Sequence, residues 1–268
     1  MDVSVKFRIY ISLLLVLVVG CQNVTGTMTQ QIAPQPTLTT PTTTEIQPTE
    51  QPATPTEEQK FIQRRTQMVE QQIAFRGIDD PEILNAMRNV PRHQFVPDDM
   101  VEMAYEDHPL PIGYGQTISQ PYIVALMTQT ISPKPGKRIL EIGTGSGYQA
   151  AILAELGMDV FTIEIIPELA QQAADRLSSL GFTNVHTRTA DGYFGWEEYA
   201  PFDAIMVTAA PDHLPQPLAN QLAEGGRLVI PIGPIGFVQT LWLFEKVNGE
   251  LQATNLGGVS FVPLTGEH

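Results

Sequence analysis

The hydrophobic pattern of the chain changes near residue 58. Beyond that point, short apolar runs alternate with longer segments in which apolar residues recur every three or four positions, the spacing of a helix with one buried face. The short runs predict strands at residues 138–142, 160–163, 185–187, 204–207, 227–231, 240–244 and near 258–262. The longer segments predict helices at residues 59–77, 81–87, 121–131, 148–156 and 167–180.

The order of these elements predicts the fold class. Short strands separated by helices are typical of βαβ units, whose parallel sheet is buried on both faces. The last three predicted strands have no full helix between them, so we expect the sheet to end in an antiparallel hairpin. The prediction is an α/β domain with a Rossmann-like, doubly wound, mostly parallel sheet, a C-terminal antiparallel hairpin and an N-terminal helical extension.

Residues 1–21 have the pattern of a targeting segment. Lys6 and Arg8 precede an apolar run at residues 9–19, which is about half the length of a bilayer span. The run ends at Gly20 and Cys21, and this ending resembles a bacterial lipoprotein signal peptide with an acylated Cys21. The alternatives are an uncleaved anchor and a misassigned start codon.

The signal also predicts where the protein works. A lipoprotein would be anchored in the cell envelope, on its periplasmic or extracellular face, and would meet the membrane only through the N-terminal lipid anchor. If the start codon or the signal is misread, the protein would be cytoplasmic. Residues 22–58 are rich in Thr, Pro and Gln and have too little apolar surface to offset the entropy of folding. We predict a disordered stalk there, followed by one folded domain at residues 59–268.

Charge and cysteine content narrow the function classes. The chain carries 15 basic and 29 acidic residues, for a net charge of −14, so its field repels phosphate backbones and nucleic acid is not an expected partner. A single cysteine excludes an internal disulfide framework. The five histidines lie far apart in the sequence, without the spacing of metal ligands, so no metal site is predicted.

A glycine-rich turn follows the strand predicted at residues 138–142. Residues 143–147 read Gly-Thr-Gly-Ser-Gly, which lets the backbone turn sharply and approach a ligand in front of a helix N-terminus. A dinucleotide-binding turn would have a glycine where this chain has Tyr148, so NAD is disfavoured. Glu164 follows the next strand and is placed to accept hydrogen bonds from ribose hydroxyls, and Asp191 could reach an adenine amino group.

Other blocks are more specific than this turn. They read Pro-Arg-His-Gln-Phe at residues 91–95, Thr-Ile-Ser-Gln-Pro at residues 117–121 and Leu-Glu-Ile-Gly-Thr-Gly-Ser-Gly-Tyr at residues 140–148. Over about residues 60–264 the chain closely resembles the protein-L-isoaspartate O-methyltransferases, which are class I S-adenosylmethionine-dependent methyltransferases. The resemblance implies S-adenosyl-L-methionine as cofactor, in a pocket formed by Glu141, Gly143, Gly145, Gly147, Glu164, Asp191, Gly192 and Gln239.

The activity implied by the resemblance is methyl transfer from S-adenosyl-L-methionine to the α-carboxylate of L-isoaspartyl residues in damaged proteins or peptides. The ester then closes to a succinimide, whose hydrolysis returns part of the residue to aspartate, so the reaction is a repair step. Isoaspartyl-containing peptides and proteins are the expected partners. Two alternatives stay open: a methyltransferase for another carboxylate or a small molecule, and a tethered binding protein without turnover.

Two hydroxyl residues are candidates for the reacting end of the site. Ser119 matches the active-site serine of the family, and Thr117 is expected to help it position the substrate. A carboxylate with an ordinary pKa of about 4 is already ionised at neutral pH, so the reaction needs positioning and exclusion of water instead of a general base. Alternatively, Thr117 and Ser119 only cap the helix that begins at Pro121. His93 and Asp203 are interpreted as structural residues.

The chain departs from the family pattern in three respects. Residue 190 is Ala where the family commonly has Gly, which we interpret as tolerated because Asp191 is retained. Residue 260 is Ser where the family usually has Arg, which puts some substrate contacts in question. The predicted export is the largest departure, because S-adenosylmethionine is made in the cytoplasm.

Overall fold

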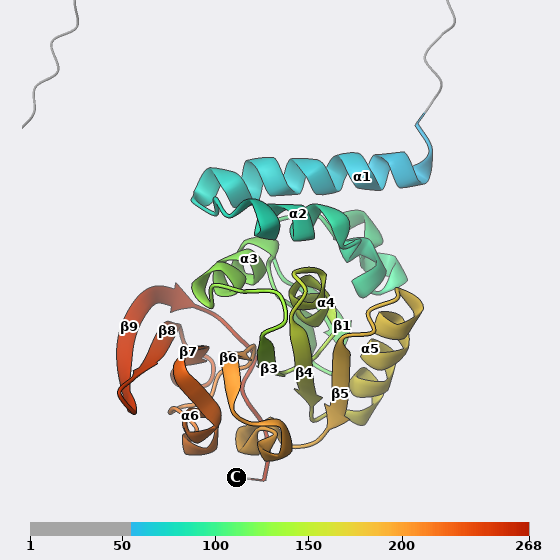
Figure 1. Ribbon diagram of the computed structural model, residues 1–268. Coiled ribbons are helices and arrows are strands. Elements are labelled where there is room, and N and C mark those ends of the chain that lie inside the picture. The colour runs from blue at the N-terminus through green and yellow to red at the C-terminus, as the bar shows by residue number, and fades with distance from the viewer. Residues whose placement is uncertain (1–54, 268) are drawn as a thin grey trace, which may run out of the picture. The chain divides into compact units, whose positions relative to one another are not determined.

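A seven-stranded mixed sheet is the centre of the fold in residues 55–267, the part of the chain that the computed structural model describes (Figure 1). Its strands are β3 (Arg138–Ile142), β4 (Asp159–Glu164), β5 (Val185–Thr189), β6 (Phe202–Val207), β7 (Leu222–Ile232), β8 (Gln239–Val247) and β9 (Glu250–Val259). The spatial order is β5-β4-β3-β6-β7-β8-β9, in which the first five are parallel and the last two pair antiparallel. The predicted α/β fold with its C-terminal hairpin is confirmed.

The central strands β3, β4 and β6 are buried on both faces, as is typical of a parallel sheet, whereas the edge strands β5 and β9 are mostly exposed. The α-helices, among the described residues, are α1 (Glu57–Gln67), α2 (Pro81–Asn89), α3 (Pro121–Thr130), α4 (Tyr148–Glu155), α5 (Pro167–Ser179) and α6 (Gln216–Gln221). Successive side chains of a strand point to opposite faces. Ile139 of β3 accordingly belongs to the core that contains residues of α2, α3 and α4, whereas Leu140 and Ile142 belong to a second core with Leu218 of α6.

The N-terminal extension is one long helical segment that changes its winding. Helix α1 continues into a π-helical stretch (Met68–Ile73) and a short 3₁₀ turn (Ala74–Arg76), and it ends at Gly77, which has a φ of 92°. Its first residue is Glu57, so residues 57 and 58, assigned by composition to the stalk, are helical. The reason is a capping box that the composition argument overlooked, in which Thr56 and Gln59 each accept a hydrogen bond from the other's backbone amide.

The last strand is not where the hydrophobic pattern put it. A strand was expected near residues 258–262, but β9 spans Glu250–Val259 and pairs with β8 along its whole length. Asn248 and Gly249 both have positive φ angles, 54° and 81°, and form the two-residue turn that joins β8 to β9. Asn-Gly is the favoured sequence for such hairpin turns, so the prediction was wrong because this turn was missed.

Three further elements were not predicted. Strands β1 (Leu110–Gly113) and β2 (Gln116–Ile118) form a separate antiparallel hairpin, and α6 precedes β7. Both hairpin strands are too short to show a clear alternation in the sequence.

The predictions for the N-terminal region lie outside the described residues. They are the signal peptide, the acylation of Cys21 and the stalk up to residue 54. Within residues 55–267, no helix has both the length and the apolar character needed to cross a bilayer.

Candidate active site

A cleft that opens to solvent lies where the parallel strands β3, β4 and β6 end. Strand β3 lies between β4 and β6 in the sheet. The connection after β3 leads to β4 on one side, and the chain later returns to form β6 on the other side, so a crevice forms between the two connections at the carboxyl ends of these strands. Its lining comes from segments far apart in the sequence: residues 116–119, 142–146, 148–149, 163–166, 192, 208–209 and 262–265, together with Val124.

The glycine-rich turn forms the floor of the cleft. Gly143 has a φ of 96°, and a Cβ atom there would lie 2.6 Å from the Thr208 Oγ1 atom. Thr208, at the end of β6, donates a hydrogen bond of 2.7 Å to the Gly143 carbonyl and so holds the turn. The Gly145 amide donates to the Glu164 Oε2 atom at 2.8 Å. Gly147 lies outside the cleft lining, where a Cβ atom would meet Leu177 of α5 at 3.3 Å, so its lack of a side chain serves helix packing.

Two carboxyl groups lie at the turn. Glu164 lines the cleft and accepts hydrogen bonds from the amides of Gly145 and Ile166, which leaves its remaining lone pairs for a ligand. Glu141 is fully buried beside it; Thr162 donates to its Oε2 atom at 2.6 Å, and its Oε1 atom has no hydrogen-bond partner among residues 55–267.

Burial raises the pKa of Glu141 to about 8 because a buried carboxylate loses its hydration; the nearby Glu164 charge adds to this shift and the Thr162 hydroxyl opposes it. Glu141, predicted to bind the cofactor, lies outside the cleft lining, whereas the Glu164 carboxyl group lies in the lining beside the open glycine turn and can accept hydrogen bonds from a ligand. S-adenosyl-L-methionine has a sulfonium and an ammonium group, so the residues present fit this cofactor.

Asp191 and Gln239, both predicted to bind the cofactor, lie outside the cleft lining. Asp191 accepts hydrogen bonds from the amides of Tyr193 and Glu267, both at 2.9 Å, whereas its neighbour Gly192 lines the cleft. Gln239 is buried, and its Oε1 atom accepts a hydrogen bond of 2.9 Å from the Phe261 amide. Both side chains therefore hold the C-terminal segment, residues 261–267, whose residues 262–265 form one wall of the cleft. The motif positions alone could not reveal the path of this segment.

Ser119 and Thr117 line the opposite wall, at the end of the β1–β2 hairpin. The capping alternative is wrong, because the N-cap of α3 is Gln120 and no side chain caps that helix. The fully buried Arg92 donates to the carbonyl oxygens of Ser119 and Ala104, both at 2.8 Å. Burial lowers the pKa of Arg92 to about 10. Arg92 thus fixes the backbone of Ser119, a role that the sequence analysis missed.

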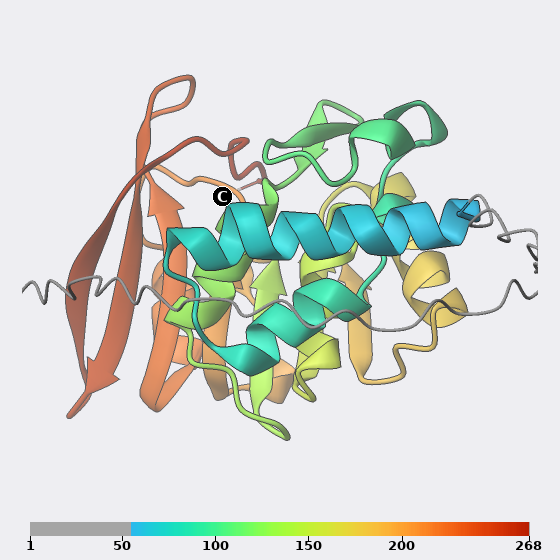
Figure 2. The ribbon, with the colours of Figure 1, turned by 90° about the horizontal axis from the view of Figure 1, so that it is seen from above.

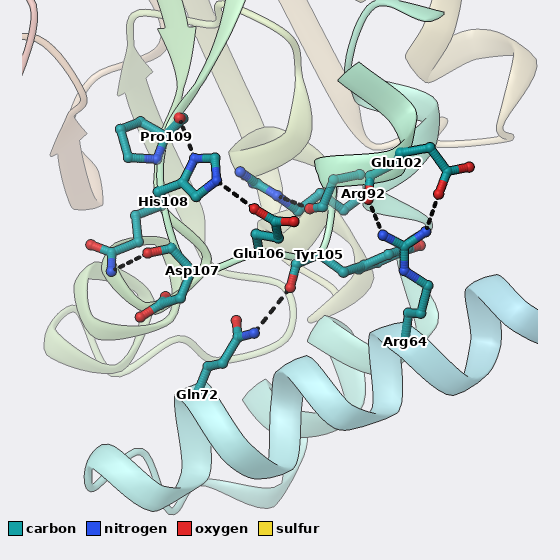
Figure 3. A network of polar contacts seen from close by, with 11 residues as sticks. Arg64, Gln72, Arg92, Glu102, Tyr105, Glu106, Asp107, His108 and Pro109 are labelled. Atoms are coloured by element: carbon teal, nitrogen blue, oxygen red, sulfur yellow. Dashed lines mark hydrogen bonds and ion pairs between the residues drawn. The ribbon is translucent and has the colours of Figure 1, made fainter. Parts of the chain in front are cut away.

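The N-terminal extension holds the segment that leads to this wall (Figure 3). Gln72 donates to the Tyr105 carbonyl at 3.1 Å, and Arg64 forms an ion pair of 3.0 Å with Glu102. His93 hydrogen-bonds the Tyr105 hydroxyl at 2.7 Å, which confirms it as a structural residue. These contacts set where the chain enters the β1–β2 hairpin.

The remaining sequence candidates lie away from the cleft. Asp203 pairs with Lys137 and accepts the Arg138 amide at the start of β6, which confirms its structural role. Ala190 donates its amide to the Glu164 carbonyl, and Ser260 is exposed outside the cleft lining. Over the described part of the chain, no group of three or more His, Cys, Asp or Glu side chains is placed to hold a metal ion.

The sheet, the glycine turn at its switch point and the antiparallel end define a class I methyltransferase. The chain matches the profile of the family described as protein-L-isoaspartate(D-aspartate) O-methyltransferase over residues 63–268. It therefore belongs to the protein-L-isoaspartate(D-aspartate) O-methyltransferase family.

Individual relatives agree with this assignment. A protein-L-isoaspartate O-methyltransferase from Picosynechococcus sp. is 58% identical over 202 residues, which are 75% of this chain and 90% of that protein. One from Opitutus terrae is 57% identical, over 76% of this chain and 87% of its own length. A solved protein-L-isoaspartate O-methyltransferase superposes with a TM-score of 0.70 at 29% identity, covering 76% of this chain and 66% of that one.

A further solved structure carries a ligand. It comes from Plasmodium falciparum, was assigned as a protein-L-isoaspartate O-methyltransferase, and is in complex with S-adenosyl-L-homocysteine. It superposes with a TM-score of 0.66 at 30% identity, covering 75% of this chain and 98% of that one.

Proposed function

We propose that the domain transfers a methyl group from S-adenosyl-L-methionine to the α-carboxylate of L-isoaspartyl residues in damaged proteins or peptides, a repair reaction. The observation that carries the proposal is the cleft itself. It brings the Thr117 and Ser119 wall together with the Gly143 and Gly145 turn, although these segments are more than twenty residues apart in the sequence.

Each wall of the cleft has its own task in this reaction. Gly143 and Gly145 let the backbone approach the cofactor closely, and Glu164 supplies carboxyl oxygens for its polar groups. When bound, S-adenosyl-L-methionine supplies a methyl group on a cationic sulfur, and transfer to a carboxylate oxygen breaks the sulfur–methyl bond without moving a proton. Ser119 therefore acts as a hydrogen-bond donor that orients the carboxylate, and residues 262–265 exclude water from one side.

The test uses the full chain, radiolabelled S-adenosyl-L-methionine and two peptides that differ only in isoaspartate or aspartate at one position. We expect label on the isoaspartyl peptide alone, removed by mild base as expected for a methyl ester. Label on other carboxylates would favour the broader methyltransferase. No label on either peptide, with S-adenosyl-L-homocysteine still bound, would favour a binding protein without turnover.

We also propose that the enzyme is a lipid-anchored protein of the cell envelope. The support is sequence alone: the basic residues Lys6 and Arg8, the apolar run after them and Cys21. In a bacterial host fed radiolabelled palmitate, the full chain should incorporate label and fractionate with membranes, and Cys21→Ser should do neither. Equal labelling of both chains would refute the anchor.

A further inference from the structure

The loop between β7 and β8, residues 233–238, exposes an apolar tip. Ile235, Phe237 and Val238 are 71%, 71% and 74% exposed, and the loop has no charged or hydrogen-bonding side chain. Large apolar side chains that lie together on the surface of a soluble protein often mark a site of contact with another molecule. We call these three residues the apolar tip.

The base of this loop is tied to the wall of the cleft. The Gly233 amide donates to the Pro211 carbonyl at 3.0 Å, two residues beyond Ala209, which lines the cleft. Gln239 joins the loop to the C-terminal wall, because it donates to the Pro234 carbonyl at 3.4 Å while accepting the Phe261 amide. The base of this loop is therefore tied to Pro211 and Phe261, which lie one or two residues from the cleft wall in the sequence.

A further exposed hydrophobic side chain lies on the other side of the cleft. Tyr114, at the turn of the β1–β2 hairpin, is 54% exposed and lies two residues before Gln116, where the Ser119 wall begins. Figure 2 shows the orange β7–β8 loop and the green β1–β2 hairpin rising on the same side of the domain, with the C-terminal segment between them.

We infer that the apolar tip binds apolar side chains that flank the isoaspartyl residue in an extended substrate chain. The inference rests on the proposed function, which places an isoaspartyl residue of a polypeptide in the cleft. The residues on either side of that isoaspartate would then lie near the apolar tip on one side of the cleft and near Tyr114 on the other. The side chains of the apolar tip cannot donate or accept hydrogen bonds, so they gain binding free energy by burying apolar surface against apolar partners. Because such side chains are buried in folded proteins, the apolar tip selects damaged segments that are already unfolded.

Charge supports a substrate chain of this kind. From residue 59 onward the chain carries 24 acidic and 13 basic residues, so an acidic substrate segment is repelled whereas an apolar one is not. The apolar tip adds an attraction that does not depend on charge. A preference for apolar flanks should therefore persist at high salt.

The test compares two isoaspartyl peptides of equal length, one with Leu and Phe beside the isoaspartate and one with Ser at both places. The full chain should show a KM about fivefold lower for the apolar peptide, as expected for partial burial of one or two side chains. In the triple variant Ile235→Ser, Phe237→Ser, Val238→Ser, the two KM values should become equal while kcat is unchanged. Fluorescence anisotropy of labelled peptides with S-adenosyl-L-homocysteine present should show the same loss in Kd.

The chain offers a matched control. Phe75 is 86% exposed in the N-terminal extension and outside the cleft lining, so Phe75→Ser removes an equally exposed apolar side chain elsewhere. It should keep the fivefold preference.

Three results would overturn the inference. The first is that the triple variant keeps the preference, and the second is that the unaltered chain methylates both peptides equally well. The third is that the triple variant keeps the peptide preference but loses an ability that the unaltered chain shows, either binding to phosphatidylcholine–phosphatidylglycerol vesicles or self-association in analytical ultracentrifugation, because the tip would then serve a lipid surface or a second copy. Failure of the proposed function is distinct, since the unaltered chain would then label neither peptide.

Discussion

Single residues in the cleft divide into those that meet ligands and those that hold other residues in place. Ser119 lines the wall, and Arg92 fixes its carbonyl from behind. Glu141 is buried next to the glycine turn with one oxygen unsatisfied by residues 55–267, and burial raises its pKa to about 8.

Removing the Ser119 hydroxyl should impair positioning and leave cofactor binding intact. For Ser119→Ala we expect kcat/KM on an isoaspartyl peptide to fall about 10- to 100-fold, because the reaction depends on orientation at the carboxylate. The affinity for S-adenosyl-L-homocysteine, measured by calorimetry, should change less than about twofold. Ser260→Ala, at an exposed position outside the cleft lining, is the control and should retain full activity. Full activity of Ser119→Ala would show that Ser119 does not position the substrate.

Glu141 should make the stability of the ligand-free domain depend on pH. Its pKa is raised from 4.5 to about 8 by burial, so the folded state binds more protons than the unfolded state between these values. The stabilisation is complete below pH 4.5 and is lost as pH rises toward 8. Between pH 6 and 8 the free energy of unfolding should drop by about 2 kcal/mol more than in Glu141→Gln. Urea unfolding at the two pH values measures this, and equal drops in both proteins would contradict it.

Among the elements, the C-terminal segment contributes residues 262–265 to the wall of the cleft. Residues 262–264 run beside Ala210, which donates to the Val262 carbonyl and accepts the Leu264 amide. Helices α1 to α5 and most strands could be predicted because each has a local period or cap, as Asp80 and Pro81 show at the start of α2. The C-terminal segment has no such period, and its position follows from contacts with distant residues.

Gln239 should affect the cofactor through this segment. Gln239→Leu removes the acceptor for the Phe261 amide, so we expect faster hydrogen exchange at residues 261–265 and about tenfold weaker binding of S-adenosyl-L-homocysteine. Gln239→Glu retains an acceptor oxygen and should recover much of the affinity. Weaker binding in Gln239→Leu without a change in exchange would instead indicate a direct contact with the cofactor.

At the scale of the whole domain, a ligand in the cleft joins segments from both halves of the sheet. Binding to the folded state alone stabilises it by about 2.7 kcal/mol at a ligand concentration of 100 times Kd. For a domain of this size that corresponds to a rise in Tm of about 5–10 °C.

S-adenosyl-L-homocysteine should produce this rise, and NAD should produce none. Gly143→Ala should abolish it, since the added Cβ atom would lie 2.6 Å from Thr208 Oγ1 at a positive φ. Gly181→Ala is the matched control, because Gly181 also has a positive φ but nothing within 4 Å of an added Cβ; it should lower Tm and keep the shift. A shift with NAD, or an undiminished shift in Gly143→Ala, would contradict the assignment of the glycine turn.

The sequence by itself determined most of the elements of the central sheet, the helices α1 to α5 and the chemistry of the glycine turn. The hydrophobic periods of helices and strands can be read from neighbouring residues. Gly143 and Gly145 can adopt positive φ angles because they have no Cβ atom, whatever their surroundings. Only the tertiary structure decided which candidates meet in the cleft: it brought Ser119 and Thr208 to the turn, placed Gln239 and Asp191 behind the C-terminal wall, and left Ile235, Phe237 and Val238 in water. These arrangements depend on packing between residues that can be more than a hundred positions apart in the sequence, and no local pattern encodes such contacts.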